Sequence, residues 1–202
     1  MCSVRPGMRS LGLICILPTL VSLLFSLSFA ACAEAQKSEA IRRFDLSIGD
    51  YFRIPEEEVV FIRQKIIDEE ELPVVFFLSA RARVHPDVIV GLRMKGYSWM
   101  DITRHYRLSP EIYYVPVKKE NLHWQEGQPY GNAYGNSRNK KDWKKITFSD
   151  REVVDQVNLK FLTQRYNYPP ETIIRYRTEG RRFGAIYEQF EKERTNRAQG
   201  LR

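Results

Sequence analysis

Residues suited to metal or acid–base chemistry are few in this chain. Its three histidines are His85, His105 and His123. Asp101 and His105 stand four positions apart, a spacing that can place two metal ligands on one face of a helix. No third ligand is evident for this pair, so we favour a solvated helix face. We predict no metal site and no bound cofactor.

Residues suited to nucleophilic catalysis are equally hard to assemble into a site. Ser79, Ser98 and Ser109 lie where helices or helix caps are expected, and the chain has no G-x-S-x-G motif. The acids at positions 69–71 fit a helix boundary. The sequence also has no P-loop, no dinucleotide fingerprint and no C-x-x-C-H motif. These absences favour a protein that is not an enzyme, and we predict no catalytic residue.

One segment alternates aromatic and cationic residues in a pattern typical of binding surfaces. Aromatic rings stack on sugars or bases, and lysines attract phosphates or anionic head groups. The alternative is that the rings fix a glycine- and asparagine-rich loop to the helices, which is the interpretation we favour. The aromatic members, which define a candidate ligand surface, are Trp124, Tyr130, Tyr134 and Trp143; the lysines are Lys140, Lys141, Lys144 and Lys145.

Most of the chain beyond residue 44 has the apolar spacing of helices. Pro55 and the three glutamates after it predict a helix start, since proline tolerates the first turn and acids there suit the helix dipole. Further helices are expected after Leu72, from Pro86 to Gly96, and from Ser98 as an N-cap. In the second half, the spacing predicts helices that start at Ser149, Pro170 and Phe183.

The most informative feature is an internal repeat. A shift of 84 positions, without gaps, aligns residues 77–106 with residues 161–190. The identical residues fall where a three-helix unit needs core residues, a proline start or a glycine stop. We therefore predict a mainly α fold, in which a duplicated three-helix unit packs as a pair. The identical residues in the first copy are Phe77, Leu78, Arg81, Pro86, Ile89, Arg93, Gly96 and Ile102.

The repeat also sets the expected organisation of the chain. Residues 44–115 form the first helical unit with an extra N-terminal helix, and residues 148–194 form the second. A long loop or linker rich in glycine, asparagine and tyrosine, residues 116–147, joins them. Residues 195–202 are expected to be a flexible tail.

Two arginines recur with the repeat: Arg81 as Arg165 and Arg93 as Arg177. The acid Asp87 recurs as the acid Glu171. The functional interpretation is a pair of equivalent anion sites. We favour ion pairs or helix-end contacts inside each unit, and expect these arginines to be partly buried.

A second pattern, Ile102 to Val115, resembles the helix-turn-helix of bacterial regulators, in which a short turn ending in serine starts the recognition helix. The net charge of +7 agrees with phosphate contacts. The second copy of the repeat, however, continues through Gln189 with no turn and no second helix start. Nucleic-acid binding is therefore the less favoured alternative.

Residues 1–35 have the order of a secretory signal. Arg5 and Arg9 precede a mostly apolar, uncharged run from Leu11 to Ala30, and small residues follow it. A membrane anchor is the alternative, since about 20 apolar residues can span a bilayer. Both interpretations place the rest of the chain outside the cytoplasm.

The three cysteines are Cys2, Cys15 and Cys32, so a chain cleaved near residue 32 has no intrachain disulfide. The segment from Phe29 to Cys32 is similar to the lipobox of bacterial lipoproteins, although phenylalanine replaces the usual leucine. Ordinary peptidase sites of the A-x-A form overlap it. Lipidation at Cys32 and simple cleavage therefore both remain open.

Several segments together resemble a group of exported bacterial proteins, among them lipoproteins, with no assigned activity. They are E-L-P-V-V-F-F-L-S-A-R-A-R-V-H-P, G-Y-S-W-M-D-I-T, P-Y-G-N-A-Y-G and the second P-E-x-I-I-R-x-R-x-x-G. The resemblance covers most of the mature chain. It implies a cell-envelope setting and carries over no site residues.

We therefore expect an exported protein, periplasmic or anchored to the membrane by lipid, that acts as a binding or scaffolding module. Its expected partner is an envelope protein or an anionic surface. One alternative is an envelope hydrolase or glycan-binding protein that uses the aromatic loop. Another is a helix-turn-helix-like nucleic-acid binder, if the export signal is misread.

Overall fold

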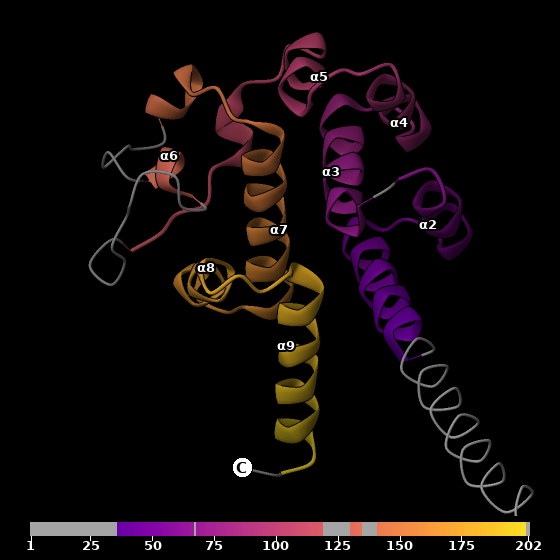
Figure 1. The fold of residues 1–202 in the computed structure, drawn as a ribbon, viewed down its shortest axis with the longest axis vertical. Coiled ribbons are helices and arrows are strands. Elements are labelled where there is room, and N and C mark those ends of the chain that lie inside the picture. Colours follow the sequence, from indigo (N-terminus) through magenta and orange to yellow (C-terminus); the bar gives the residue numbers. More distant parts are fainter. Residues whose placement is uncertain (1–35, 67, 119–129, 135–140, 201–202) are drawn as a thin grey trace, which may run out of the picture. The chain divides into compact units, whose positions relative to one another are not determined.

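The computed structural model describes residues 36–66, 68–118, 130–134 and 141–200 (Figure 1). The chain divides into two compact units, residues 1–39 and 40–202. Of the first unit only residues 36–39 are described, and they are helical. The account below concerns the second unit.

The protein is mainly helical, and no strand occurs in the described ranges. Residues 36–52 are helical and are followed by α2 (Glu56–Arg63), α3 (Leu72–Ala82), α4 (Pro86–Met94) and α5 (Trp99–His105). The second half contains α7 (Asp150–Tyr166), α8 (Pro170–Thr178) and α9 (Phe183–Ala198). Shorter elements are η1 (Glu69–Glu71), η2 (Pro110–Tyr113), α6 (Gly131–Tyr134) and η4 (Asp142–Lys145).

The predicted helix starts are confirmed, and local chemistry explains them. Ser98 and Ser149 each accept a hydrogen bond from the backbone N–H three residues on, and the acids at those positions bond back. This capping box satisfies donors that the first turn leaves free. At α4, the Nδ1 of His85 accepts from the backbone N–H of Asp87, so this histidine is a helix cap.

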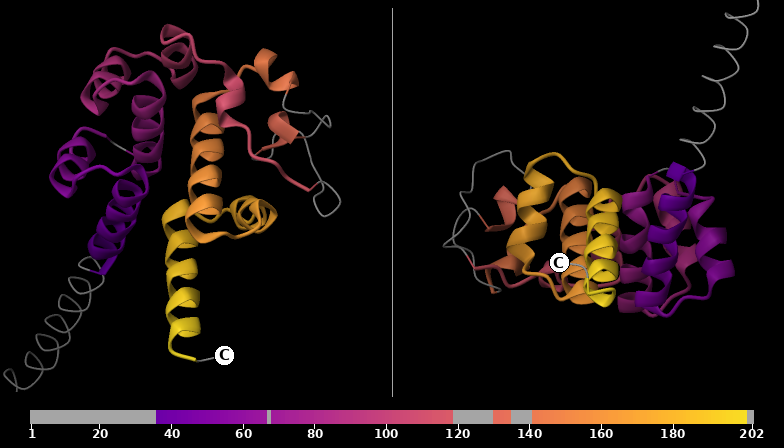
Figure 2. Two further views of the ribbon diagram at one scale, coloured as in Figure 1. Left: turned by 180° about the vertical axis from the view of Figure 1, so that it is seen from behind. Right: turned by 90° about the horizontal axis from the view of Figure 1, so that it is seen from below.

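The centre of the fold is the pair α3 and α7, which pack against each other (Figures 1 and 2). Residues 72–79 of α3 are all buried, which accounts for the apolar run on every side of that helix. Helix α4 packs on α3, while α8 and α9 pack on α7. The helix at residues 36–52 joins this core through Phe44, whose ring lies 6.1 Å from that of Phe161 and 5.3 Å from that of Tyr187.

Four helix boundaries in the two halves fall 84 residues apart: the ends of α3 and α7, both ends of α4 and α8, and the starts of α5 and α9. Helices α4 and α8 each begin with proline and have nine residues. The C-caps of α3 and α7, Arg83 and Asn167, are both left-handed, with φ of 58° and 53°. Gly96 and Gly180 have φ of 87° and 85°. We call α3–α5 the first trio and α7–α9 the second trio.

Three segments differ from expectation. Residues 110–113 form a single 3-10 turn, so the recognition helix of a helix-turn-helix is not formed there. The segment expected to be a linker contains α6 and η4, and α9 continues to Ala198. Among the helices that the structure describes, none is long and apolar enough to cross a membrane.

Substituting the glycines that end α4 and α8 should test their conformational role. A Cβ at Gly96 or Gly180 would meet no atom within 4 Å, so the cost of alanine there is purely that of a positive φ. We expect Gly96→Ala and Gly180→Ala each to lower the free energy of unfolding by about 1 kcal/mol. Urea denaturation measures the change.

Gly91 provides the matched control. It lies inside α4, its φ is not positive, and its Cβ position is equally open. Gly91→Ala should stabilise the protein by up to about 1 kcal/mol, because alanine is the better helix former. If Gly91→Ala and Gly96→Ala changed the free energy of unfolding equally, the positive φ of Gly96 would not be the reason for glycine at that position.

Candidate functional site

The most deeply buried charges form one cluster around Arg177 of α8. This side chain is 4% exposed and donates from Nε to Asp155 Oδ1 at 2.9 Å and from Nη2 to Glu70 Oε2 at 3.3 Å. Glu70 also accepts a hydrogen bond from the backbone N–H of Phe183. The ring of Phe183 lies 4.7 Å from the guanidinium. Every charge in this core therefore has a partner, as burial in a low dielectric requires.

A similar arrangement surrounds Arg93 of α4. Its guanidinium donates at 2.8 Å to Asp150 and at 2.8 Å to Glu71, and lies 4.3 Å from the centre of the Trp99 ring. The backbone N–H of Trp99 donates to Asp150, as that of Phe183 does to Glu70. In both clusters the arginine joins the end of one helix to the start of the next.

These contacts decide between the two interpretations of the recurring arginines. Arg93 and Arg177 are partly and almost fully buried, as expected, and each lies against the ring that starts the next helix of its own unit. Their ion pairs are not confined to one unit, because Arg93 binds Asp150 and Arg177 binds Glu70. The expected burial is wrong for Arg81 and Arg165, which are exposed at the outer ends of α3 and α7, although Arg165 pairs with Asp50. Neither buried arginine is free to bind an external anion.

Burial changes the ionisation of the acid beside Arg177. The pKa of Asp155 is raised from 3.8 to about 7, chiefly because burial removes the carboxylate from water. The positive charge of Arg151 acts in the opposite direction, and the negative charge of Glu70 adds to the rise. Arg151 is largely exposed and lies 3.6 Å from Asp155. A perturbed carboxyl can signal a catalytic acid. Here the carboxyl faces Arg177 rather than a cavity, so its role is structural.

The aromatic loop does not present the ligand surface that was considered for it. Tyr130, Tyr134 and Trp143 are 1%, 2% and 0% exposed. The hydroxyls of Tyr130 and Tyr134 donate to the backbone oxygens of Asp155 and Val115. These three rings fix their segment to α7 and η2, because burying an aromatic ring is more favourable than leaving it in water. Trp124 and Cys32 lie outside the described residues.

The histidine and serine candidates are accounted for by local structure. Asp101 caps α5 through Ser98, and His105 is exposed at the other end of the same short helix. Ser79 donates to the backbone oxygen of Val84. No group of three potential metal ligands occurs in the ranges that the structure describes. His123 falls outside those ranges.

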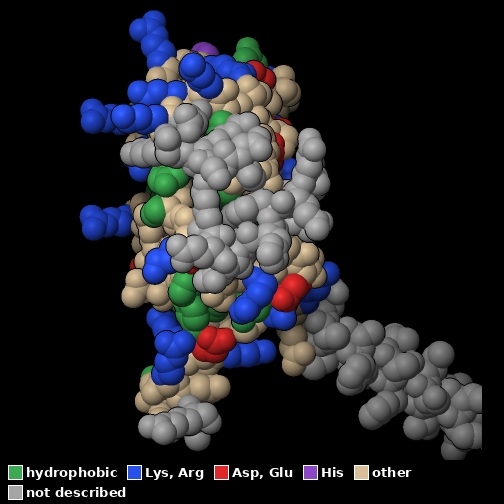
Figure 3. Space-filling view, turned by 90° about the vertical axis from the view of Figure 1, so that its left-hand side faces the viewer, with side chains coloured by type: hydrophobic (Ala, Val, Ile, Leu, Met, Phe, Trp, Pro, Cys, Tyr) green, Lys and Arg blue, Asp and Glu red, His purple; other side chains and the backbone are tan. Residues whose placement is uncertain are grey.

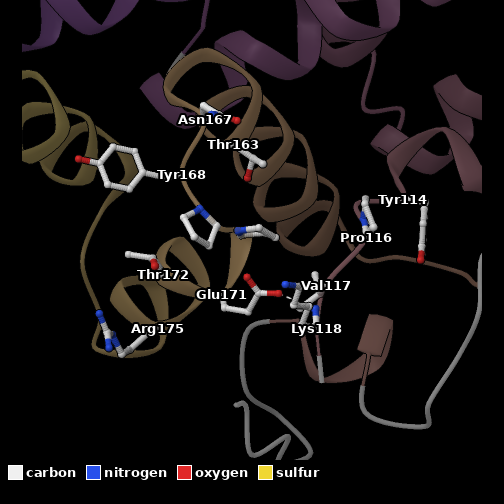
Figure 4. Close-up of a pocket in the computed structure, with 12 residues that line it drawn as sticks. Tyr114, Pro116, Val117, Lys118, Thr163, Asn167, Tyr168, Glu171, Thr172 and Arg175 are labelled. Atoms are coloured by element: carbon white, nitrogen blue, oxygen red, sulfur yellow. Dashed lines mark hydrogen bonds between the residues drawn. The ribbon is translucent and has the colours of Figure 1, made fainter. Parts of the chain in front are cut away.

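A groove with a volume of about 970 Å³ lies beside α8 (Figure 4). One wall is the extended segment that follows η2, and the other is the turn from α7 into α8 together with the outer face of α8. This volume is typical of ligand sites. The groove is lined by Tyr114, Pro116, Val117, Lys118, Thr163, Asn167, Tyr168, Pro169, Pro170, Glu171, Thr172 and Arg175.

The groove combines apolar surface with polar groups at its edges. Two tyrosines and three prolines supply rigid apolar surface. The side chains of Lys118 and Arg175 are exposed, and Figure 3 shows lysine and arginine prevailing over acids on this face. The one acid, Glu171, accepts a hydrogen bond from the backbone N–H of Lys118 and so ties the two walls together. The buried Oγ1 of Thr163 has no hydrogen-bond partner among the described residues.

This set of groups is suited to binding. The described lining of the groove includes no histidine and no cysteine, and the hydroxyl of Tyr168 donates to the carboxylate of Glu193 on α9. Sequence reasoning missed the groove because its walls come from residues 114–118, 163–172 and 175, and no pattern in the sequence links these stretches. The nearest signal was the Pro169–Pro170 pair, interpreted only as a helix start.

Comparison with known proteins does not assign the chain to a class. No family model matches it, and no match was found among curated proteins or solved structures. Its function must therefore be argued from its own residues.

Stability should respond to pH through Asp155. Because its folded-state pKa of about 7 exceeds the ordinary 3.8, the folded protein keeps a proton there that the unfolded chain has lost. The stability contributed by Asp155 is therefore largest at about pH 4 and falls as the pH rises through about 7. Relative to wild type, Asp155→Asn should become more stable over this interval, as urea denaturation at several pH values would reveal.

Asp101 supplies the control for this experiment. Hydrogen bonds from Ser98 lower the pKa of its exposed carboxyl, so it is ionised throughout that interval. Asp101→Asn should leave the pH dependence unchanged above about pH 5. If the stability difference between wild type and Asp155→Asn were the same at every pH, Asp155 would not be the source of the pH dependence.

Proposed function

We propose that this protein is an exported cell-envelope binding module, and that the groove beside α8 is its ligand site. The observation that carries the proposal is the groove itself, with two tyrosines, three prolines and two exposed cations along an open surface of α8. Rigid aromatic and proline surface is what proteins use to hold extended segments of partners. An envelope protein with an extended, acidic or proline-containing segment fits this chemistry best.

The absence of a catalytic arrangement in the described ranges supports binding over hydrolysis. The most perturbed acid, Asp155, lies in an ion pair, and the candidate serines are caps or core residues. Three of the four aromatic rings considered for a glycan-binding loop, Tyr130, Tyr134 and Trp143, are in the core. A scaffolding role needs only a stable frame and an exposed groove, and both are present.

We also propose that the frame arose by duplication of a three-helix unit. The equivalent helix starts, left-handed caps and arginine clusters of the two trios support this. Duplication explains why each arginine stacks on an aromatic ring at the start of the next helix.

The export part of the proposal is tested by the intact mass of the protein recovered from membrane and soluble fractions of a bacterial host. We expect a product without the first 31 residues or more, because residues 1–35 have the order of a secretory signal. A mass that begins at Cys32 with added diacylglycerol would identify a lipid anchor. A mass that begins at Glu34 or Gln36 would identify a free periplasmic protein. An unprocessed chain in the cytoplasm would contradict export.

The binding part is tested by photo-crosslinking in living cells. A photoreactive amino acid at Thr172, in the groove, should yield an adduct with an envelope protein, identified by mass spectrometry. The charge reversal Arg175→Glu should reduce this adduct several-fold, because Arg175 is an exposed cation of the groove.

Lys192 is the matched control, since it is exposed on α9 and does not line the groove. A photoreactive amino acid at position 192 should not yield the adduct that forms at Thr172. The change Lys192→Glu should leave the Thr172 adduct at its wild-type level. The proposal fails if the adducts are the same at both positions, or if Arg175→Glu leaves the groove adduct intact.

A further inference from the structure

The large apolar side chains that the structure leaves exposed are concentrated in one region. Of the described residues, those with substantial exposure are Val60 and Phe61 on α2, Val88 and Met94 on α4, and Tyr97 just after it. Met94 is 75% exposed. Helices α2 and α4 contact each other and lie on the same side of α3 (Figures 1 and 2). Exposed apolar residues gathered in this way mark interaction surfaces, whereas scattered ones need no explanation.

A cavity opens at one end of this region. It has a volume of about 320 Å³ and lies between the end of α2 and the C-terminal half of α4. Val75, Val90, Met94 and Trp99 supply apolar walls, and the paired side chains of Arg93 and Glu71 also line it. The cavity has room for one large apolar side chain, which would contact Met94 at the rim.

A shallow basic hollow adjoins the cavity and shares Gly96 with it. Its cations are Lys95 and Arg104, with exposed His105 beside them. Its acid, Asp101, accepts hydrogen bonds from Ser98 and also pairs with Arg104 at 3.4 Å. The exposed Lys95 has no ion pair among the described residues. An apolar cavity and a cationic surface therefore stand next to each other, on opposite sides of one glycine.

We infer that the cavity and the basic hollow together dock an acidic peptide segment of a partner protein, with one bulky apolar residue in the cavity and a neighbouring acid over Lys95. The choice of occupant rests on charge complementarity. Lys95 and Arg104 outnumber the one acid of the hollow, Asp101, so an acid next to the apolar anchor is attracted, while a basic segment would be repelled. An apolar anchor in a pocket with charges at its rim is the usual arrangement of a binding hot spot. The site is separate from the groove beside α8 and does not depend on the function proposed for it.

The test is a selection of short random peptides displayed on phage against the purified protein, followed by affinity measurement with a labelled synthetic copy of the best peptide. We expect enriched peptides to carry a phenylalanine, leucine or methionine flanked by aspartates or glutamates. Met94→Glu and Lys95→Glu should each weaken binding at least about tenfold, and added salt should weaken it further.

Two control variants make the result specific. Lys192→Glu matches Lys95→Glu on another helix, and Arg175→Glu alters the groove beside α8. Both should leave peptide affinity unchanged. A selection that enriches no peptide, or enriches basic or neutral ones, would overturn the inference, as would affinity that survives Met94→Glu.

Discussion

The carboxylates of Glu70 and Asp150 hold this fold together, because each crosses from one half of the molecule to the other. Glu70 belongs to η1, at the start of the first trio, yet it binds Arg177 and the first N–H of α9. Asp150 begins α7, yet it binds Arg93 and the first N–H of α5. A buried arginine is tolerated only with its charge matched and its donors satisfied. Each trio thus depends on an acid supplied by the other.

The same contacts between the two halves also explain how the apolar core is arranged. To bring Glu70 to Arg177 and Asp150 to Arg93, the starts of α3 and α7 must lie side by side, which places the two central helices in contact. The side-chain amide of Asn158 on α7 strengthens this register by donating to the backbone oxygen of Glu70. The outer helices border different hollows: α8 borders the groove, and α4 borders the smaller cavity.

Much of the frame could be predicted from the sequence, because local chemistry sets it. Capping boxes at Ser98 and Ser149 and the prolines before α4 and α8 act within a few residues of where they stand. Recurrence predicted partial burial correctly for Arg93 and Arg177 but not for Arg81 and Arg165, because it marks equivalent positions and not their depth. The acids that pair with Arg93 and Arg177 could not be chosen in advance, because Glu70–Arg177 and Asp150–Arg93 span long stretches of chain. For the same reason the groove was missed. The buried rings of Tyr130, Tyr134 and Trp143 agree with the favoured interpretation, in which they fix their segment to the helices.

The crossed carboxylates also affect the order in which the chain can acquire its structure. A ribosome delivers residues from the N-terminus onward, and α5 and Arg93 are complete long before Asp150 exists. Until then Arg93 has only Glu71 to neutralise it, and the N–H at the start of α5 has no carboxylate to accept its hydrogen bond. The first trio is consequently an incomplete intermediate, and a fragment that stops before α7 would expose the apolar face of α3. We therefore expect native structure to form as a single cooperative event once the second half is present, rather than in two successive steps.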